Sequence, residues 1–129
     1  MSAYLLDTHL LIWAGIGSDR LSSATRSVLE DPSIEVRFSV VSLWEVVIKL
    51  QLGRADFQVD PDALRAHARL AGLVELPVTG EHALGVRSLP DLHGDPFDRL
   101  LIAQARHEEL TLLTVDQQVL AYGGGVERG

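Results

Sequence analysis

Four acidic side chains are the residues of this sequence best suited to chemistry. They are Asp7, Glu45, Asp98 and Asp116. Three follow apolar, strand-like runs and one lies at the start of a helix-like segment, and in a parallel sheet such positions collect along the carboxyl edge of the strands. Four carboxylates gathered there would repel one another unless cations neutralised them, and carboxylate-bound Mg²⁺ or Mn²⁺ commonly serves phosphate chemistry. The pattern therefore predicts a metal-dependent phosphodiesterase site.

Each of these acids also has a purely structural explanation. Asp7 and Asp116 can cap the helices expected to follow them. Glu45 stands three residues after Ser42 and can complete a capping box with it. Asp98 falls in a first helical turn, where the helix dipole favours negative charge. Because Ser, Thr and Asn cap helices equally well, an acid at all four positions favours a shared site over four separate caps.

Two hydroxyl groups accompany the acids. Thr8 follows Asp7, and Thr114 lies two residues before Asp116. A hydroxyl in such a position can hydrogen-bond a carboxylate or a metal-bound water and fix its orientation. We therefore expect both threonines to support the site.

The elements that must position these residues alternate along the chain. Short apolar runs predict strands at residues 3–6, 36–41, 73–76 and 111–115. Caps, prolines and periodic apolar residues predict helices at residues 8–13, 22–30, 42–53, 60–71, 79–86, from Asp95-Pro96 onward, and 116–122. Alternating strands and helices predict an α/β fold, a three-layer α/β/α sandwich around a parallel sheet. The sheet has four strands, or five if the glycine-rich tail at residues 123–129, which is poor strand material, adds one.

Composition narrows the class of protein. The 129 residues predict a single domain spanning positions 1–129, and 47% hydrophobic with 22% charged residues is typical of a globular core. The absence of cysteine excludes disulfides and thiolate zinc sites. No apolar run reaches the ~18 residues of a membrane span, and no signal peptide is recognisable, so we expect a cytoplasmic protein. The formal charge of −7 argues against a nucleic-acid coat protein but not against a nuclease, because the site itself contains four of the acids.

The remaining motifs carry less information. The five histidines show no HxxxH spacing, and no phosphate-binding glycine loop or GxSxG elbow occurs. His9 and His93 stand beside acidic residues, where each is either a substrate contact or a structural histidine. Trp13 and Trp44 fit a core or an interface better than a base-stacking platform.

Taken together, four segments of the chain resemble the PIN-domain ribonucleases, and closely the VapC toxins of bacterial toxin–antitoxin pairs. The segments are residues 6–13, 42–49, 93–105 and 114–116. The resemblance implies that Asp7, Glu45, Asp98 and Asp116 are the catalytic, metal-binding quartet. It implies that Asp95 is an auxiliary acid and that Thr8 and Thr114 match hydroxyl positions of the family. Lys49 matches a basic position, which either contacts phosphate or pairs with Glu45 on the helix surface.

The same resemblance implies a function. It predicts an endoribonuclease toxin that uses one or two Mg²⁺ or Mn²⁺ ions, cleaves single-stranded regions of structured RNA and leaves 5′-phosphate and 3′-hydroxyl ends. It also implies a homodimer and a cognate antitoxin that inhibits cleavage. Two features depart from the family pattern: Gly94 replaces a basic residue, and the tail lacks an apolar final strand.

Two alternatives to the nuclease are protein-binding modules without activity. One is a catalytically silent PIN-like domain, against which the intact quartet argues. The other is a receiver-like domain, which needs an aspartate at the end of its third strand. Here that strand is followed by Pro77-Val78-Thr79, without an acid.

Overall fold

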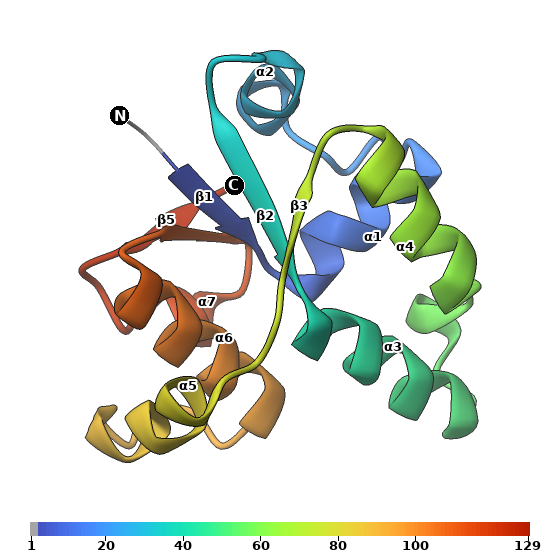
Figure 1. Ribbon diagram of the computed structural model, residues 1–129. Coiled ribbons are helices and arrows are strands. Elements are labelled where there is room, and N and C mark those ends of the chain that lie inside the picture. The colour runs from blue at the N-terminus through green and yellow to red at the C-terminus, as the bar shows by residue number, and fades with distance from the viewer. Residues whose placement is uncertain (1–2) are drawn as a thin grey trace.

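A parallel β-sheet forms the centre of the molecule (Figure 1). The computed structural model describes residues 3–129, and within them the sheet has five strands in the order β3-β2-β1-β4-β5. The strands are β1 (Ala3–Leu6), β2 (Glu35–Ser39), β3 (Val74–Leu76), β4 (Thr111–Thr114) and β5 (Val126–Arg128). All neighbouring pairs are parallel, so the carboxyl ends of the strands share one edge.

Helices cover both faces of this sheet. They are α1 (Thr8–Ile16), α2 (Ser23–Glu30), α3 (Val40–Gln51), α4 (Pro61–Leu70), α5 (Gly80–Gly85), α6 (Pro96–Glu108) and α7 (Gln117–Leu120). Helices α1, α2 and α4 contribute to the core on one face, and α6 and α7 to the core on the other, beside which α5 packs (Figure 1). Helix α3 runs away from the end of β2 and contacts α1, α4 and α6. The predicted three-layer α/β/α sandwich is confirmed.

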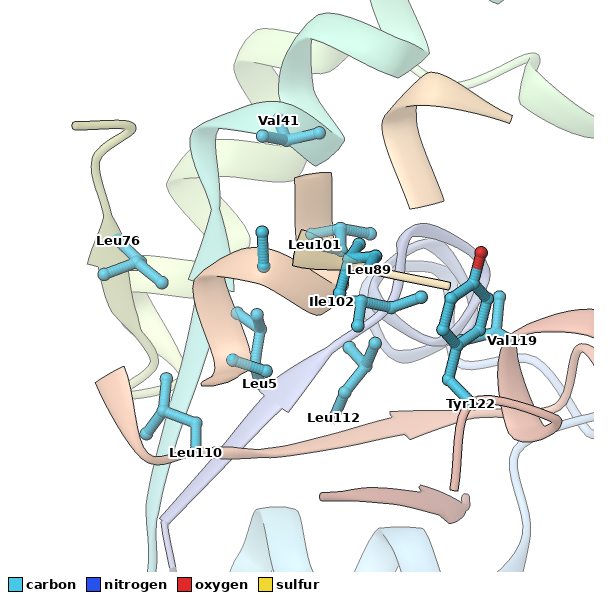
Figure 2. Close-up of a cluster of buried hydrophobic side chains, with 12 residues drawn as sticks. Leu5, Val41, Leu76, Leu89, Leu101, Ile102, Leu110, Leu112, Val119 and Tyr122 are labelled. Carbon is cyan, nitrogen blue, oxygen red and sulfur yellow. The ribbon is translucent and has the colours of Figure 1, made fainter. Parts of the chain in front are cut away.

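The central strands are apolar on both sides because both of their faces are covered. Successive side chains of a strand point to opposite faces of the sheet. Leu5 accordingly packs in one cluster with Leu112 of β4 and with Leu101 and Ile102 of α6 (Figure 2), whereas Leu6 belongs to the cluster on the α1 side. All five of these side chains are fully buried.

The predicted boundary between the second strand and its helix was wrong. Strand β2 ends at Ser39, whose Oγ accepts the Val41 N–H at 2.9 Å and so caps α3. Valine favours strands locally, but this cap and the burial of Val41 in the core outweigh that preference. Ser42 therefore lies inside the helix and forms no capping box with Glu45. The earlier start moves Glu45 to the second turn, on a buried side of α3.

The tail does form a fifth strand. Gly123 and Gly125 have φ angles of +75° and +85°, a conformation that other residues rarely adopt, and they return the chain from α7 to the sheet. The Leu112 N–H then donates to the Gly125 carbonyl at 2.8 Å. Only Val126 of β5 packs against the core. Backbone pairing with β4, more than apolar side chains, holds β5 in the sheet. Its residue types therefore give little indication of a strand.

The other predicted elements are present with small shifts at their ends. Two 3₁₀ turns, Ala55–Phe57 and Val86–Ser88, were not predicted. Within residues 3–129, no helix combines the length and apolar character needed to cross a membrane.

Candidate active site

The acids predicted from the sequence line one cavity of about 250 Å³ at the carboxyl edge of the sheet. Its acidic lining residues are Asp7, Glu45, Asp95, Asp98 and Asp116. They come from the end of β1, from α3, from the start of α6 and from the end of β4. The structure thus brings together all the acids that the sequence singled out.

Asp7 is held from two sides. It caps α1, with its Oδ1 accepting the Leu10 N–H at 2.9 Å. Its Oδ2 accepts the hydroxyl proton of Thr114 at 2.5 Å. The residue is only 5% exposed, and burial raises the pKa of its carboxyl group, an effect that the Thr114 hydrogen bond partly offsets.

Thr114 joins the first acid to the last. While its hydroxyl donates to Asp7, the same oxygen accepts the backbone N–H of Asp116 at 3.0 Å. Asp116 in turn caps α7, accepting the Gln118 N–H on Oδ1 at 2.8 Å. One buried hydroxyl therefore fixes the spacing between β1 and the loop after β4.

Thr8 hydrogen-bonds Glu45 as Thr114 hydrogen-bonds Asp7. Its hydroxyl oxygen lies 2.6 Å from Glu45 Oε1 and 2.9 Å from Ser42 Oγ. Because a hydroxyl has a single proton and an ionised carboxylate only accepts, Thr8 donates to Glu45 and accepts from Ser42. Burial raises the pKa of Glu45 to about 7, the Thr8 hydrogen bond lowers it, and the charge of Asp98 raises it further.

Asp98 is positioned by two neighbours at the start of α6. Asp95 caps this helix, and its Oδ1 accepts the N–H groups of Phe97 at 2.8 Å and of Asp98 at 3.1 Å. The ring of His93 places Nε2 2.8 Å from Asp98 Oδ2. Burial raises the pKa of Asp98 to about 6, repulsion from Asp95 adds to this, and His93 acts in the opposite direction.

These shifts indicate the chemistry that the cavity suits. Burial and mutual repulsion both disfavour ionised carboxylates, and a bound divalent cation would reverse both effects. The donors are carboxylate oxygens, with the imidazoles of His9 and His93 also lining the cavity, a set that fits Mg²⁺ or Mn²⁺ and lacks the thiolates of a structural zinc site.

Basic side chains lie at the same cavity. Lys49 does not form an ion pair with Glu45 or any other acid in residues 3–129, so the structure lacks the pairing that was one of its two expected roles. Its ammonium lies 5.7 Å from the ring centre of Phe57 and 6.0 Å from that of Phe97. Arg54 also lines the cavity. Sequence reasoning missed Arg54, because nothing distinguishes it from a surface arginine.

The role of His93 was underestimated. The sequence marked it only as a neighbour of Asp95, while the loop before α6 turns its ring onto Asp98. Its position two residues before Asp95 was the available signal. His9 instead contacts Asp56, at 3.5 Å, and the edge of the Phe57 ring.

A second cavity of about 540 Å³ adjoins the acidic one and shares Asp7, His9 and Asp116 with it. Its wall includes Trp13, and the Arg20 guanidinium lies 5.8 Å from the centre of that ring. The acidic cavity is therefore continuous with a larger, partly apolar surface.

Comparisons with solved structures agree on the fold. A chain of the VapBC2 complex of Rickettsia felis, determined with a promoter DNA fragment, has a TM-score of 0.70 at 15% identity, covering 98% of both chains. A toxin–antitoxin complex from Klebsiella pneumoniae gives 0.65 at 19%, covering 96% of this chain and 95% of the other. VapBC-1 of nontypeable Haemophilus influenzae gives 0.60 at 18%, covering 98% and 96%.

The strand order also excludes the receiver-like alternative, whose sheet has the order 2-1-3-4-5. Comparison with curated protein sequences gives no match. The sequence model of the PIN domain matches residues 4–124, which is nearly the whole chain. This chain belongs to the PIN domain family.

Proposed function

We propose that this protein is a VapC-type toxin, a metal-dependent endoribonuclease. The observation that carries the proposal is the convergence of five carboxylates, from separate segments, on one cavity in which the pKa values of Asp7, Glu45 and Asp98 are raised. Structural acids tend to have partners that lower their pKa, whereas these are held in a site that favours added positive charge.

Asp7 and Asp98 are the proposed central ligands of one or two Mg²⁺ or Mn²⁺ ions, with Glu45 and Asp116 completing the set. A bound divalent ion supplies Lewis acidity toward a phosphoryl oxygen and makes water a nucleophile near neutral pH. The chain supplies orientation: Thr114 holds Asp7, and Thr8 holds Glu45, as described above.

The basic residues and the adjoining cavity support a polymeric substrate. Lys49 and Arg54 put positive charge beside the acids, where the phosphates flanking a scissile bond would lie. The larger cavity with Trp13 and Arg20 gives room for an unpaired nucleotide next to that bond. Together with the resemblance to chains from toxin–antitoxin complexes, this supports cleavage of single-stranded regions of structured RNA in the cytoplasm.

The test is cleavage of total bacterial RNA by the purified protein, freed of any bound antitoxin, with Mn²⁺ and with EDTA. We expect cuts at a small number of unpaired positions, with 5′-phosphate ends that a ligase accepts, and none in EDTA. A folded protein that binds Mn²⁺ but cuts no RNA would contradict the proposal and favour the catalytically silent module.

Exposed apolar residues support the proposed partners. Trp44 of α3 is 54% exposed and Leu52, the residue directly after that helix, is 70% exposed, whereas the apolar residues Leu10 to Ile12 of α1 are core. We assign this outer side of α3 to contact with a second copy of the chain, and the acidic cavity to a cationic segment of the antitoxin. Light scattering of the antitoxin-free protein should give the mass of a dimer, and a monomer at micromolar concentration would contradict the homodimer.

A further inference from the structure

His93 lines the acidic cavity and contacts one of its acids directly. Its Nε2 is 2.8 Å from Asp98 Oδ2. A ring nitrogen of His93, a carboxylate oxygen of Asp98 and one of Asp116 all lie within 4.8 Å of one another. The side chains of His93 and Asp98 are only 11% and 18% exposed.

These distances are compatible with ligand atoms gathered around a single ion. Bonds of about 2.1 Å in octahedral geometry place adjacent ligand atoms about 3 Å apart and opposite ones about 4 Å apart. The 2.8 Å between His93 Nε2 and Asp98 Oδ2 is close to the adjacent spacing, and the 4.8 Å limit on all three separations is slightly above the opposite spacing. If the imidazole only oriented Asp98, this would explain the 2.8 Å between His93 Nε2 and Asp98 Oδ2. It would not explain why the ring nitrogen and the Asp98 oxygen both lie close to a carboxylate oxygen of Asp116.

A second histidine cluster shows what a poor metal site looks like. Among the described residues, His82, His107 and Glu108 are similarly close together. However, the Thr79 N–H donates to His82 Nδ1 at 3.1 Å, so a neutral ring must carry its proton on Nε2, the atom that faces Glu108. The proton on His82 Nε2 therefore lies where a metal ion shared with Glu108 would have to bind. No donor in residues 3–129 points at Nδ1 of His93, so its Nε2 is free to lose its proton to a metal.

We propose that His93 Nε2 is a direct ligand of the cation held by Asp98 and Asp116, and that the site therefore prefers Mn²⁺ to Mg²⁺. The inference rests on the proposed function, because it assumes that the acidic cavity binds a divalent cation. Imidazole is a ligand of transition metals, whereas Mg²⁺ is held almost entirely by oxygen. An imidazole in the ligand set thus selects between two ions that carboxylates alone would treat alike.

Pulsed electron paramagnetic resonance of bound Mn²⁺ tests this directly, because a coordinated imidazole couples its ¹⁴N nucleus to the metal electrons. The samples are the wild type, His93→Gln and His9→Gln. Gln keeps a hydrogen-bonding group near Asp98, and His9 is the matched control because it lines the same cavity. We expect ¹⁴N coupling in the wild type and in His9→Gln, and its loss in His93→Gln. We also expect Mn²⁺ affinity to fall at least about tenfold in His93→Gln, with a smaller change for Mg²⁺.

The outcomes separate the inference from the proposed function. Bound Mn²⁺ without ¹⁴N coupling in the wild type would overturn the inference, leave the metal site intact and make His93 a residue that only positions Asp98. Coupling that disappears in His9→Gln but not in His93→Gln would overturn it as well. A wild type that binds no Mn²⁺ would contradict the proposed function itself.

Discussion

Replacing Asp98 with Asn is expected to abolish RNA cleavage while leaving the protein at least as stable as the wild type. The substitution removes a negative charge from the proposed metal site, and we expect the rate to fall by at least about a hundredfold. Folding should not suffer, because Asp95 caps α6 through backbone N–H groups, which the substitution leaves in place. A neutral side chain also avoids the cost of burial that raises the pKa of Asp98 to about 6.

The measurement pairs cleavage rate with urea unfolding, at pH 8 and with Mn²⁺ in the cleavage assay. Asp62→Asn is the matched control, because Asp62 is exposed on α4 and lines neither the acidic cavity nor the adjoining one. The control is expected to retain near wild-type cleavage. Full activity in Asp98→Asn would remove Asp98 from the proposed ligands.

Asp7 is a less suitable test, although its Asn variant is also expected to be inactive. An amide at Asp7 would turn an N–H group toward Thr114, whose oxygen already accepts the Asp116 N–H. The hydroxyl of Thr114 would then have to find another acceptor in a buried place, which costs about 1–3 kcal/mol. Loss of activity in that variant would therefore mix a missing ligand with a weakened fold.

Asp7 and Asp116 could be located from sequence because their positions at strand ends follow from the topology. Once β1 and β4 are recognised as adjacent parallel strands, Asp7 and Asp116 must meet at the same edge. The sequence offered a cap role for each of these residues and favoured a shared site. The structure shows that the cap role is real: Asp7, Asp95 and Asp116 all accept backbone N–H groups at helix starts. Capping orients these carboxylates toward the cavity, so a cap role does not argue against a ligand role.

What sequence reasoning missed depends on contacts distant along the chain. The start of α3 was misplaced because Val40 and Val41 favour a strand locally, and only packing against the core decides otherwise. The strand β5 exists through backbone pairing with β4, for which side-chain patterns carry no signal. The contact between His93 and Asp98 depends on the path of the loop before α6, which no periodicity describes.

The second large effect concerns the metal-free protein, whose stability is expected to fall as the pH rises from about 5 to about 8. The pKa of Glu45 is raised from 4.5 to about 7, so the folded state keeps a proton that the unfolded state has already released. Where the folded state binds more protons, stability decreases with rising pH. The shift of Glu45 alone corresponds to about 3 kcal/mol, and Asp98 changes in the same direction.

Below about pH 4.5 the trend is expected to reverse. Hydrogen bonds from Arg65 hold the pKa of Glu75 below its usual value, so the stability from this pair is lost as Glu75 becomes protonated. The pair is partly exposed to solvent, which screens it, so its contribution is smaller than that of Glu45. The metal-free protein should therefore be most stable near pH 5, at the acidic end of the usual range, and this optimum follows from the buried acids.

Urea unfolding followed by circular dichroism, from pH 4 to pH 8 in EDTA, measures this curve for the wild type and for Glu45→Gln. Gln has the shape of Glu without its titration, so the fall between pH 5 and pH 8 should shrink by about 3 kcal/mol in the variant. Saturating Mn²⁺ should move the wild-type optimum toward neutral pH, because a metal that binds only the folded, ionised site stabilises it increasingly as protons leave. If stability in EDTA rises between pH 5 and pH 8, the acids at this edge are not held at raised pKa values. The cavity would then lack the unfavourable burial and repulsion of carboxylates that a divalent cation would relieve.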